Sequence, residues 1–148
     1  MSCTVYVMVG LPGSGKSTYI KNNLNDLPIV SRDIIRCEIG FCGKDVKFVG
    51  TKEQEDLVTQ YENNKIEYYI NNNIDFVIDN INIGKWRKIL VEKLRNYGCK
   101  IIMVWLKTPI DICIERRNGD IDKDIMTNIN SRFVEPNKTE YDELIVVN

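Results

Sequence analysis

The stretch GLPGSGKST, residues 10–18, decides the fold, and it directly follows the apolar run TVYVMV at residues 4–9. Residues 10–17 match the pattern G-x-x-x-x-G-K-[ST] at every fixed position. In such a loop the glycines let successive backbone N–H groups approach phosphate oxygens, and the helix that follows adds positive potential. The sequence therefore predicts a nucleotide-phosphate loop made of Gly10, Leu11, Pro12, Gly13, Ser14, Gly15, Lys16, Ser17 and Thr18.

Two side chains of this loop have separate predicted roles. Lys16 is expected to reach the β- and γ-phosphates of ATP, and the Ser17 hydroxyl is expected to ligate Mg²⁺. A glycine-rich strand-to-helix turn that merely contains Lys-Ser is the structural alternative, but the order strand, loop, helix favours phosphate binding. A GTPase is not favoured, because NKTE at residues 137–140 ends in Glu where a guanine-binding motif has Asp.

Composition narrows the chemistry further. The chain has 148 residues, a formal net charge of −1, five cysteines and no histidine. Without a CxxC pair or a histidine a zinc site is not expected, and any general base must be Asp, Glu, Lys, Tyr or Cys. No targeting segment or 18-residue apolar run is visible, so we expect a cytoplasmic protein with no membrane partner.

Short apolar runs alternate with amphipathic stretches, which is typical of a parallel α/β sheet. We predict a three-layer α/β P-loop NTPase fold of the small-kinase type. It has a five-stranded, mainly parallel sheet, helices on both faces and a helical lid at about 109–135, in one domain spanning 1–148. The expected strands are 4–9, 28–31, 74–79, 99–106 and 141–148. The expected helices are 15–24, 32–39, a long helix opened by a capping box at Thr51 and Gln54, 86–97, 109–118 and 121–133.

The stretch VSRDIIR, residues 30–36, is a candidate for the acceptor side of a kinase. Asp33 falls in the first turn of the predicted helix, and Arg36 is three residues on, on the same face. Asp33 would then act on an acceptor hydroxyl and Arg36 on an acceptor phosphate. The alternative is an ordinary i,i+3 ion pair at a helix N-terminus, and this stretch alone leaves both open.

In order and spacing, the motifs GLPGSGKST, SRDIIR, VIDNIN, ERRNG and YDELIVVN resemble the phage-type polynucleotide 5′-hydroxyl kinase domain over nearly the whole chain. The resemblance implies transfer of the ATP γ-phosphate to a 5′-OH end of DNA or RNA, with a ligase as a candidate partner in the same pathway. It further implies Asp33 as general base, Arg36 as the clamp on the phosphate 3′ to the terminal nucleoside, and Asp79 as an acceptor-side contact. The arginine that contacts the β/γ-phosphates is either Arg116 or Arg117.

Several alternatives stay open at this point. Asp79 is either an acceptor contact or a partner of Mg²⁺, and Asn80 is either a substrate contact or a turn former. The basic residues between 85 and 100, Arg87 among them, form either a solvated helix face or a nucleic-acid face. Candidate contacts for an incoming strand are Lys44, Lys47 and Lys52. Phe41 and Phe48 are either aromatics on which a base stacks or loop anchors packed on the core. A small-molecule kinase acting on a nucleoside or sugar acid, and a non-catalytic or toxin-like ATP-binding module, are the competing functions.

Overall fold

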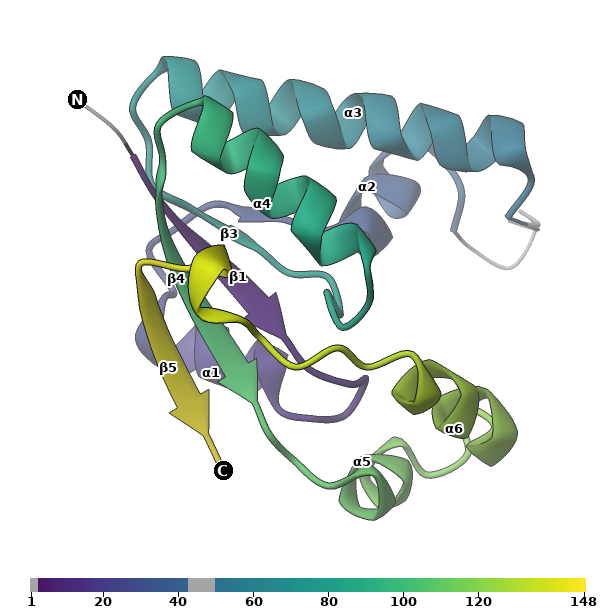
Figure 1. The fold of residues 1–148 in the computed structure, drawn as a ribbon. Helices are drawn as coiled ribbons and strands as arrows, with labels where there is room; N and C mark the ends of the chain where they lie inside the picture. Colours follow the sequence, from purple (N-terminus) through teal and green to yellow (C-terminus); the bar gives the residue numbers. More distant parts are fainter. Residues whose placement is uncertain (1–2, 43–49) are drawn as a thin grey trace.

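A five-stranded sheet forms the centre of the molecule (Figure 1), seen in a computed structural model that describes residues 3–42 and 50–148. The strand order is β2-β3-β1-β4-β5, and every neighbouring pair is parallel. The strands are β1 (Thr4–Val9), β2 (Ile29–Val30), β3 (Phe76–Ile78), β4 (Lys100–Leu106) and β5 (Glu143–Val147). The predicted sheet is thus confirmed and is parallel throughout. Lys44, Lys47 and Phe48 lie outside the described residues.

Helices cover both faces of this sheet, as a three-layer fold requires (Figure 1). Helix α1 (Lys16–Asn23) lies on one face, and α3 (Lys52–Asn71) and α4 (Trp86–Asn96) lie on the other. Side chains of β1 alternate between the two cores: Val7 packs in the α3/α4 core, while Met8 packs with Ile20 of α1. Burial of both sheet faces explains the almost continuously apolar strands.

The remaining helices gather near the carboxyl ends of the strands. Helix α2 (Arg32–Glu38) follows β2, whereas α5 (Ile110–Arg117) and α6 (Lys123–Ser131) follow β4 (Figure 1). The second strand is shorter than expected, because the Ser31 hydroxyl accepts from the Ile34 N–H and so caps α2 immediately after Val30. Likewise α6 begins only at Lys123, because the Asp122 carboxylate caps it.

A short 3₁₀ helix, η1 (Lys138–Glu140), occupies the NKTE stretch and was not predicted. Its Glu140 carboxylate accepts from Arg87 of α4, with Nε–Oε2 at 2.9 Å and Nη2–Oε1 at 3.1 Å. Arg87 is only 2% exposed. The interpretation that placed Arg87 on a solvated or nucleic-acid-binding face is therefore wrong: helical spacing alone does not reveal a buried ion pair.

Within residues 3–42 and 50–148, no helix combines the length and the apolar character needed to cross a membrane.

Candidate functional site

The phosphate loop is shaped by glycines where other residues would not fit. Gly13 and Gly15 have φ values of 83° and 104°, in the left-handed region that favours glycine. A Cβ on Gly13 would lie 2.8 Å from the Cys113 carbonyl oxygen and 3.0 Å from Cγ of Arg117. Helix α1 begins directly after Gly15, and no side chain among the described residues caps it. The first N–H groups of α1 are therefore available to an anion.

Two residues of the predicted loop take a different place. Gly10 and Leu11 do not line the pocket at the loop: Leu11 is 6% exposed, and the Gly10 N–H donates to the Ile81 carbonyl. A Cβ on Gly10 would lie 2.5 Å from Oγ of Ser14 and 3.2 Å from Cβ of Leu106, so a side chain there would crowd both residues. That Gly10 and Leu11 contact the nucleotide therefore stays a prediction, and neither residue lines the pocket in this structure.

Lys16 lies folded back on the loop. Its Nζ donates to the carbonyl oxygens of Gly10 and Leu11, each at 3.0 Å. Burial lowers the pKa of the Lys16 ammonium, while the nearby carboxylates of Asp79 and Asp33 favour the charged form. The two carbonyls therefore hold the ammonium inside the pocket.

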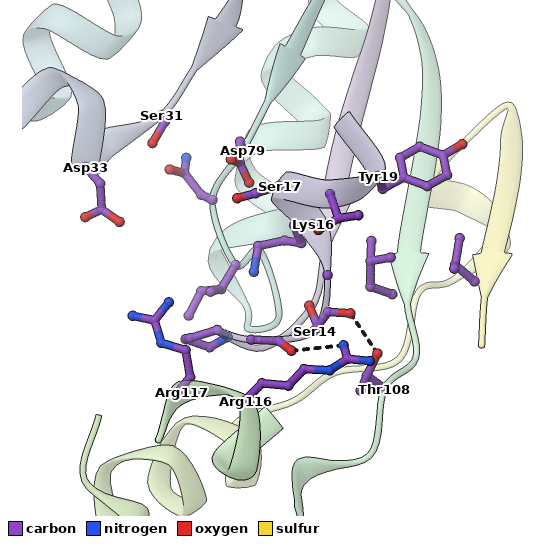
Figure 2. Close-up of a pocket in the computed structure, with 18 of the residues that line it drawn as sticks. Ser14, Lys16, Ser17, Tyr19, Ser31, Asp33, Asp79, Thr108, Arg116 and Arg117 are labelled. Carbon is purple, nitrogen blue, oxygen red and sulfur yellow. Dashed lines mark hydrogen bonds between the residues drawn. The ribbon is translucent and has the colours of Figure 1, made fainter. Parts of the chain in front are cut away.

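Ser17 and Asp79 both line this pocket (Figure 2). Asp79 follows β3 and is half-buried, and this burial raises the pKa of its carboxyl group, opposed by the charge of Lys16. A hydroxyl and a carboxylate are oxygen ligands of the kind Mg²⁺ takes, with phosphates and water completing its shell. The described residues contain no group of three or more His, Cys, Asp or Glu that could hold a metal ion by itself. The two side chains thus suit a metal held jointly with a nucleotide.

Helix α2 carries Asp33 and Arg36 to the opposite wall. The Asp33 side chain is 90% exposed, and its Oδ1 accepts from Nη1 of Arg36 at 2.6 Å. Asp33 projects toward the space that Lys16 and Arg117 also face (Figure 2). Arg36 in addition bonds Glu55 of α3 through Nη2, at 3.1 Å. The i,i+3 ion pair, which the sequence left as the alternative to a catalytic role, is present, and both of its residues line the pocket.

Asn80 connects the end of β3 to α2 and α3. Its Oδ1 accepts from the Arg32 N–H at 3.0 Å, and its Nδ2 donates to Glu62 at 3.1 Å. The Arg32 guanidinium in turn pairs with Glu55 and Glu62. Asn80 lines the pocket, but the oxygen and the nitrogen of its amide are both bonded to other residues of the protein, at the first turn of α2 and on α3.

The two candidate lid arginines differ in surroundings. Arg116 is exposed, lines the pocket and donates through Nη1 to the Gly13 carbonyl at 3.3 Å. Arg117 packs its aliphatic stem on Gly13, and its Nε is buried with no hydrogen-bond partner among the described residues. Its guanidinium faces the space between Asp33 and Lys16 (Figure 2). Arg117 is thus the better placed of the two for a phosphate.

One pocket of about 970 Å³ unites these groups. Apart from Gly10 and Leu11, every predicted site residue lines it. Glu55, Glu62 and Arg32 were not predicted, because their contacts join α2 to a helix 19 to 30 residues further on and no local pattern signals them. The pocket thus has a phosphate-binding wall on the loop and an acid–arginine wall on α2.

This fold and its phosphate loop define a P-loop domain of the kinase type. A family model described as an AAA domain matches residues 5–119, and the chain belongs to that family.

Solved structures similar to this chain share its fold at low identity. A chain of the Pnkp1/Rnl/Hen1 RNA repair complex superposes with a TM-score of 0.76 at 18% identity, over 88% of this chain but only 44% of that one. Kti12 of Chaetomium thermophilum, in complex with ADP-AlF3, superposes with a TM-score of 0.65 at 18% identity, over 97% of this chain and 88% of that one. The APS kinase CysC of Mycobacterium tuberculosis, in complex with AMPPNP and APS, superposes with a TM-score of 0.60 at 16% identity, over 98% of this chain and 88% of that one.

Proposed function

We propose that this chain is an ATP- and Mg²⁺-dependent kinase that transfers the γ-phosphate to the 5′-hydroxyl end of DNA or RNA. The observation that carries the proposal is the position of Asp33, which is 90% exposed and yet lines the same pocket as Lys16. A strand end needs an open acceptor wall, because the rest of the strand must extend out of the site.

The proposed reaction uses the two walls together. Asp33 takes the proton of the 5′-hydroxyl group. The oxygen of that hydroxyl group forms a bond to the γ-phosphorus, and the bond between the γ-phosphorus and the β-phosphate oxygen breaks, which releases ADP. Lys16 and Arg117 neutralise charge on the transferred group. Bound Mg²⁺ would neutralise the phosphates further, with Ser17 and Asp79 as its protein ligands.

Arg36 is proposed to bind the phosphate that follows the terminal nucleoside. Its Nη2 now bonds Glu55, which also bonds Arg32. Glu55 therefore keeps one cationic partner if an acceptor phosphate takes its place on Arg36. A guanidinium suits this role, because it binds phosphate oxygens through two parallel N–H groups.

A small-molecule kinase is the second candidate, and one observation favours it. On the α2 wall of the pocket, the guanidiniums of Arg32 and Arg36 are already paired with the carboxylates of Asp33, Glu55 and Glu62. Such a surface also suits a neutral polyol or nucleoside. The resemblance to the APS kinase at the level of the fold agrees with this class as well.

An acceptor panel tests the proposal. Labelled ATP is offered with a 5′-OH oligonucleotide, a 3′-nucleotide, a free nucleoside and a sugar acid under the same conditions. We expect label on the oligonucleotide and on the 3′-nucleotide, each of which has a phosphate for Arg36. Label on the nucleoside or sugar acid alone would support the second candidate, and ATP binding without any transfer would support a non-catalytic module.

The proposed product places the protein in a reaction sequence. A 5′-phosphate end is what a ligation reaction consumes, so a ligase is the partner we propose for the next step. The similar chain of known structure belongs to a complex described as an RNA repair complex, which agrees with that order.

A further inference from the structure

The turn that ends α2 folds the chain back onto the helix. The Gly40 N–H donates to the Cys37 carbonyl at 3.2 Å, and the Phe41 N–H donates to the Arg36 carbonyl at 2.6 Å. These two bonds make a Schellman motif, in which Gly40 takes the left-handed conformation with φ of 86°. Cys42 follows directly and is thereby returned to the last turn of α2.

Two thiols meet at this turn. Cys37 and Cys42 lie on either side of this turn, and a hydrogen bond with the Cys42 side chain raises the pKa of the Cys37 thiol. Both cysteines are exposed, whereas Cys3, Cys99 and Cys113 are buried. Neither Cys37 nor Cys42 lines the pocket, so the phosphoryl-transfer chemistry proposed above does not account for the pair.

We propose that Cys37 and Cys42 form a redox modification site, at which a hydroperoxide converts the two thiols into an intramolecular disulfide that a dithiol reductant reverses. One thiol, as its thiolate, attacks a peroxide oxygen; the O–O bond breaks, giving a sulfenic acid and an alcohol or water. The other sulfur then attacks the sulfenic sulfur, the S–S bond forms, and water leaves. The two thiols lose two electrons and two protons, and the peroxide is reduced.

Exposure distinguishes this pair from a second pair of cysteines, Cys3 and Cys99. The sulfurs of Cys3 and Cys99 are 3.8 Å apart, but both side chains are buried. Burial raises the pKa of the Cys99 thiol to about 12 and keeps a peroxide in solution away from it. Cys3 and Cys99 therefore serve as an internal comparison for the exposed pair.

Mass spectrometry of the folded, full-length chain tests the proposal. The chain is treated with a stoichiometric amount of hydrogen peroxide, denatured, alkylated with iodoacetamide and digested with trypsin. Cleavage after Arg36 and Lys44 releases CEIGFCGK, residues 37–44, which holds both thiols and no other cysteine. We expect this peptide to be unalkylated and two hydrogen atoms lighter, and to regain both alkyl groups if dithiothreitol precedes alkylation. The peptides with Cys3, Cys99 and Cys113 should be alkylated throughout.

Two variants test whether the disulfide forms because of the folded turn or only because the two cysteines are close in sequence. Gly40→Ala should slow disulfide formation roughly five- to thirty-fold, because alanine disfavours the left-handed conformation by about 1–2 kcal/mol. Gly98→Ala is the matched control, since Gly98 ends α4 with the same pair of hydrogen bonds and a φ of 79°. It should leave the rate at residues 37–44 unchanged.

Three results would each overturn the proposal. In the first, residues 37–44 stay fully alkylated after peroxide treatment. In the second, they carry sulfinic acid without a disulfide. In the third, the disulfide forms as fast in Gly40→Ala as in the wild-type chain, which would show that the turn does not bring the thiols together.

Discussion

Asp33 is the residue on which the proposed chemistry depends most. Its carboxylate stands on a different element from the phosphate loop and contacts Arg36, not Lys16. We expect Asp33→Asn to lower kcat about 10²- to 10⁴-fold, the usual contribution of a general base. The dissociation constant for ATP, measured by calorimetry, should stay close to that of the wild-type chain.

The control for this substitution is Asp111→Asn, because Asp111 is likewise an exposed aspartate in the first turn of a helix, here α5. It should leave kcat unchanged. If Asp33→Asn lost ATP affinity instead of kcat, Asp33 would belong to the nucleotide side, and its role as base would be wrong.

Arg116 and Arg117 are adjacent in sequence and differ in predicted effect. Arg117 has a buried Nε without a partner among the described residues and faces the pocket, whereas Arg116 is exposed. Arg117→Ala should lower kcat about 100-fold or more, as removal of a group that stabilises transition-state charge does. Arg116→Ala should change kcat much less. Steady-state measurements of kcat for both variants show which arginine acts on the transferred phosphate. A larger loss of kcat in Arg116→Ala than in Arg117→Ala would contradict the assignment of Arg117.

At the scale of elements, the loop between β1 and α1 was predictable, because its motif lies within nine consecutive residues. The helix α2 was predictable from its own sequence as well, but its cap was not, since Ser31 was assigned to the second strand. The support around α2 was not: Glu55 and Glu62 reach it from α3, and Asn80 reaches it from the end of β3. These contacts form only once the sheet order brings β2 next to β3.

Asn80 is therefore expected to act on the site by positioning α2. Asn80→Ala removes the acceptor of the Arg32 N–H and should lower the free energy of unfolding by about 1 kcal/mol. Asp33 directly follows Arg32, so a shift of the Arg32 backbone would displace the Asp33 carboxylate. We therefore expect kcat to fall while the KM for ATP stays unchanged. The matched control is Asn72→Ala, where the lost amide bonds only the Tyr68 carbonyl of its own helix. A lowered stability with unchanged kcat would limit Asn80 to a structural role.

At the scale of the whole molecule, the buried pair of Arg87 and Glu140 joins α4 to η1. The Nη1 of Arg87 also donates to the Asn82 carbonyl at 3.0 Å, which ties the pair to the loop after β3. A local pattern gave no indication of this pair, because the two residues lie 53 positions apart. The NKTE stretch, which superficially approaches a guanine-binding motif, thus has a structural use in this fold.

The pair gives stability a dependence on pH. Hydrogen bonds from Arg87 and from the Asn137 N–H hold the pKa of Glu140 below its usual 4.5, against the opposing effect of burial. A lowered pKa in the folded state stabilises the protein above the unfolded-state value, and this contribution is lost as pH falls below about 4.5 toward the folded-state pKa. Urea denaturation at a series of acidic pH values should show that loss.

Glu140→Gln should lower the free energy of unfolding at neutral pH by about 3 kcal/mol, because it leaves a buried guanidinium without its counter-charge. It should also reduce the dependence of stability on acidic pH. The control is Glu92→Gln, at an exposed residue of α4, the helix that carries Arg87, and it should do neither. Equal stability of Glu140→Gln and the wild-type chain would contradict the structural role of the pair.

The most direct test of the proposed function compares kcat/KM for a 5′-OH oligonucleotide with kcat/KM for the matching free nucleoside, in the wild-type chain and in Arg36→Ala. A contact between a guanidinium and a phosphate is worth about 1.5–3 kcal/mol, so the wild-type chain should prefer the oligonucleotide about 10- to 100-fold. Arg36→Ala should lose that preference. Equal use of both acceptors by the wild-type chain, or a preference that survives in Arg36→Ala, would contradict the proposal.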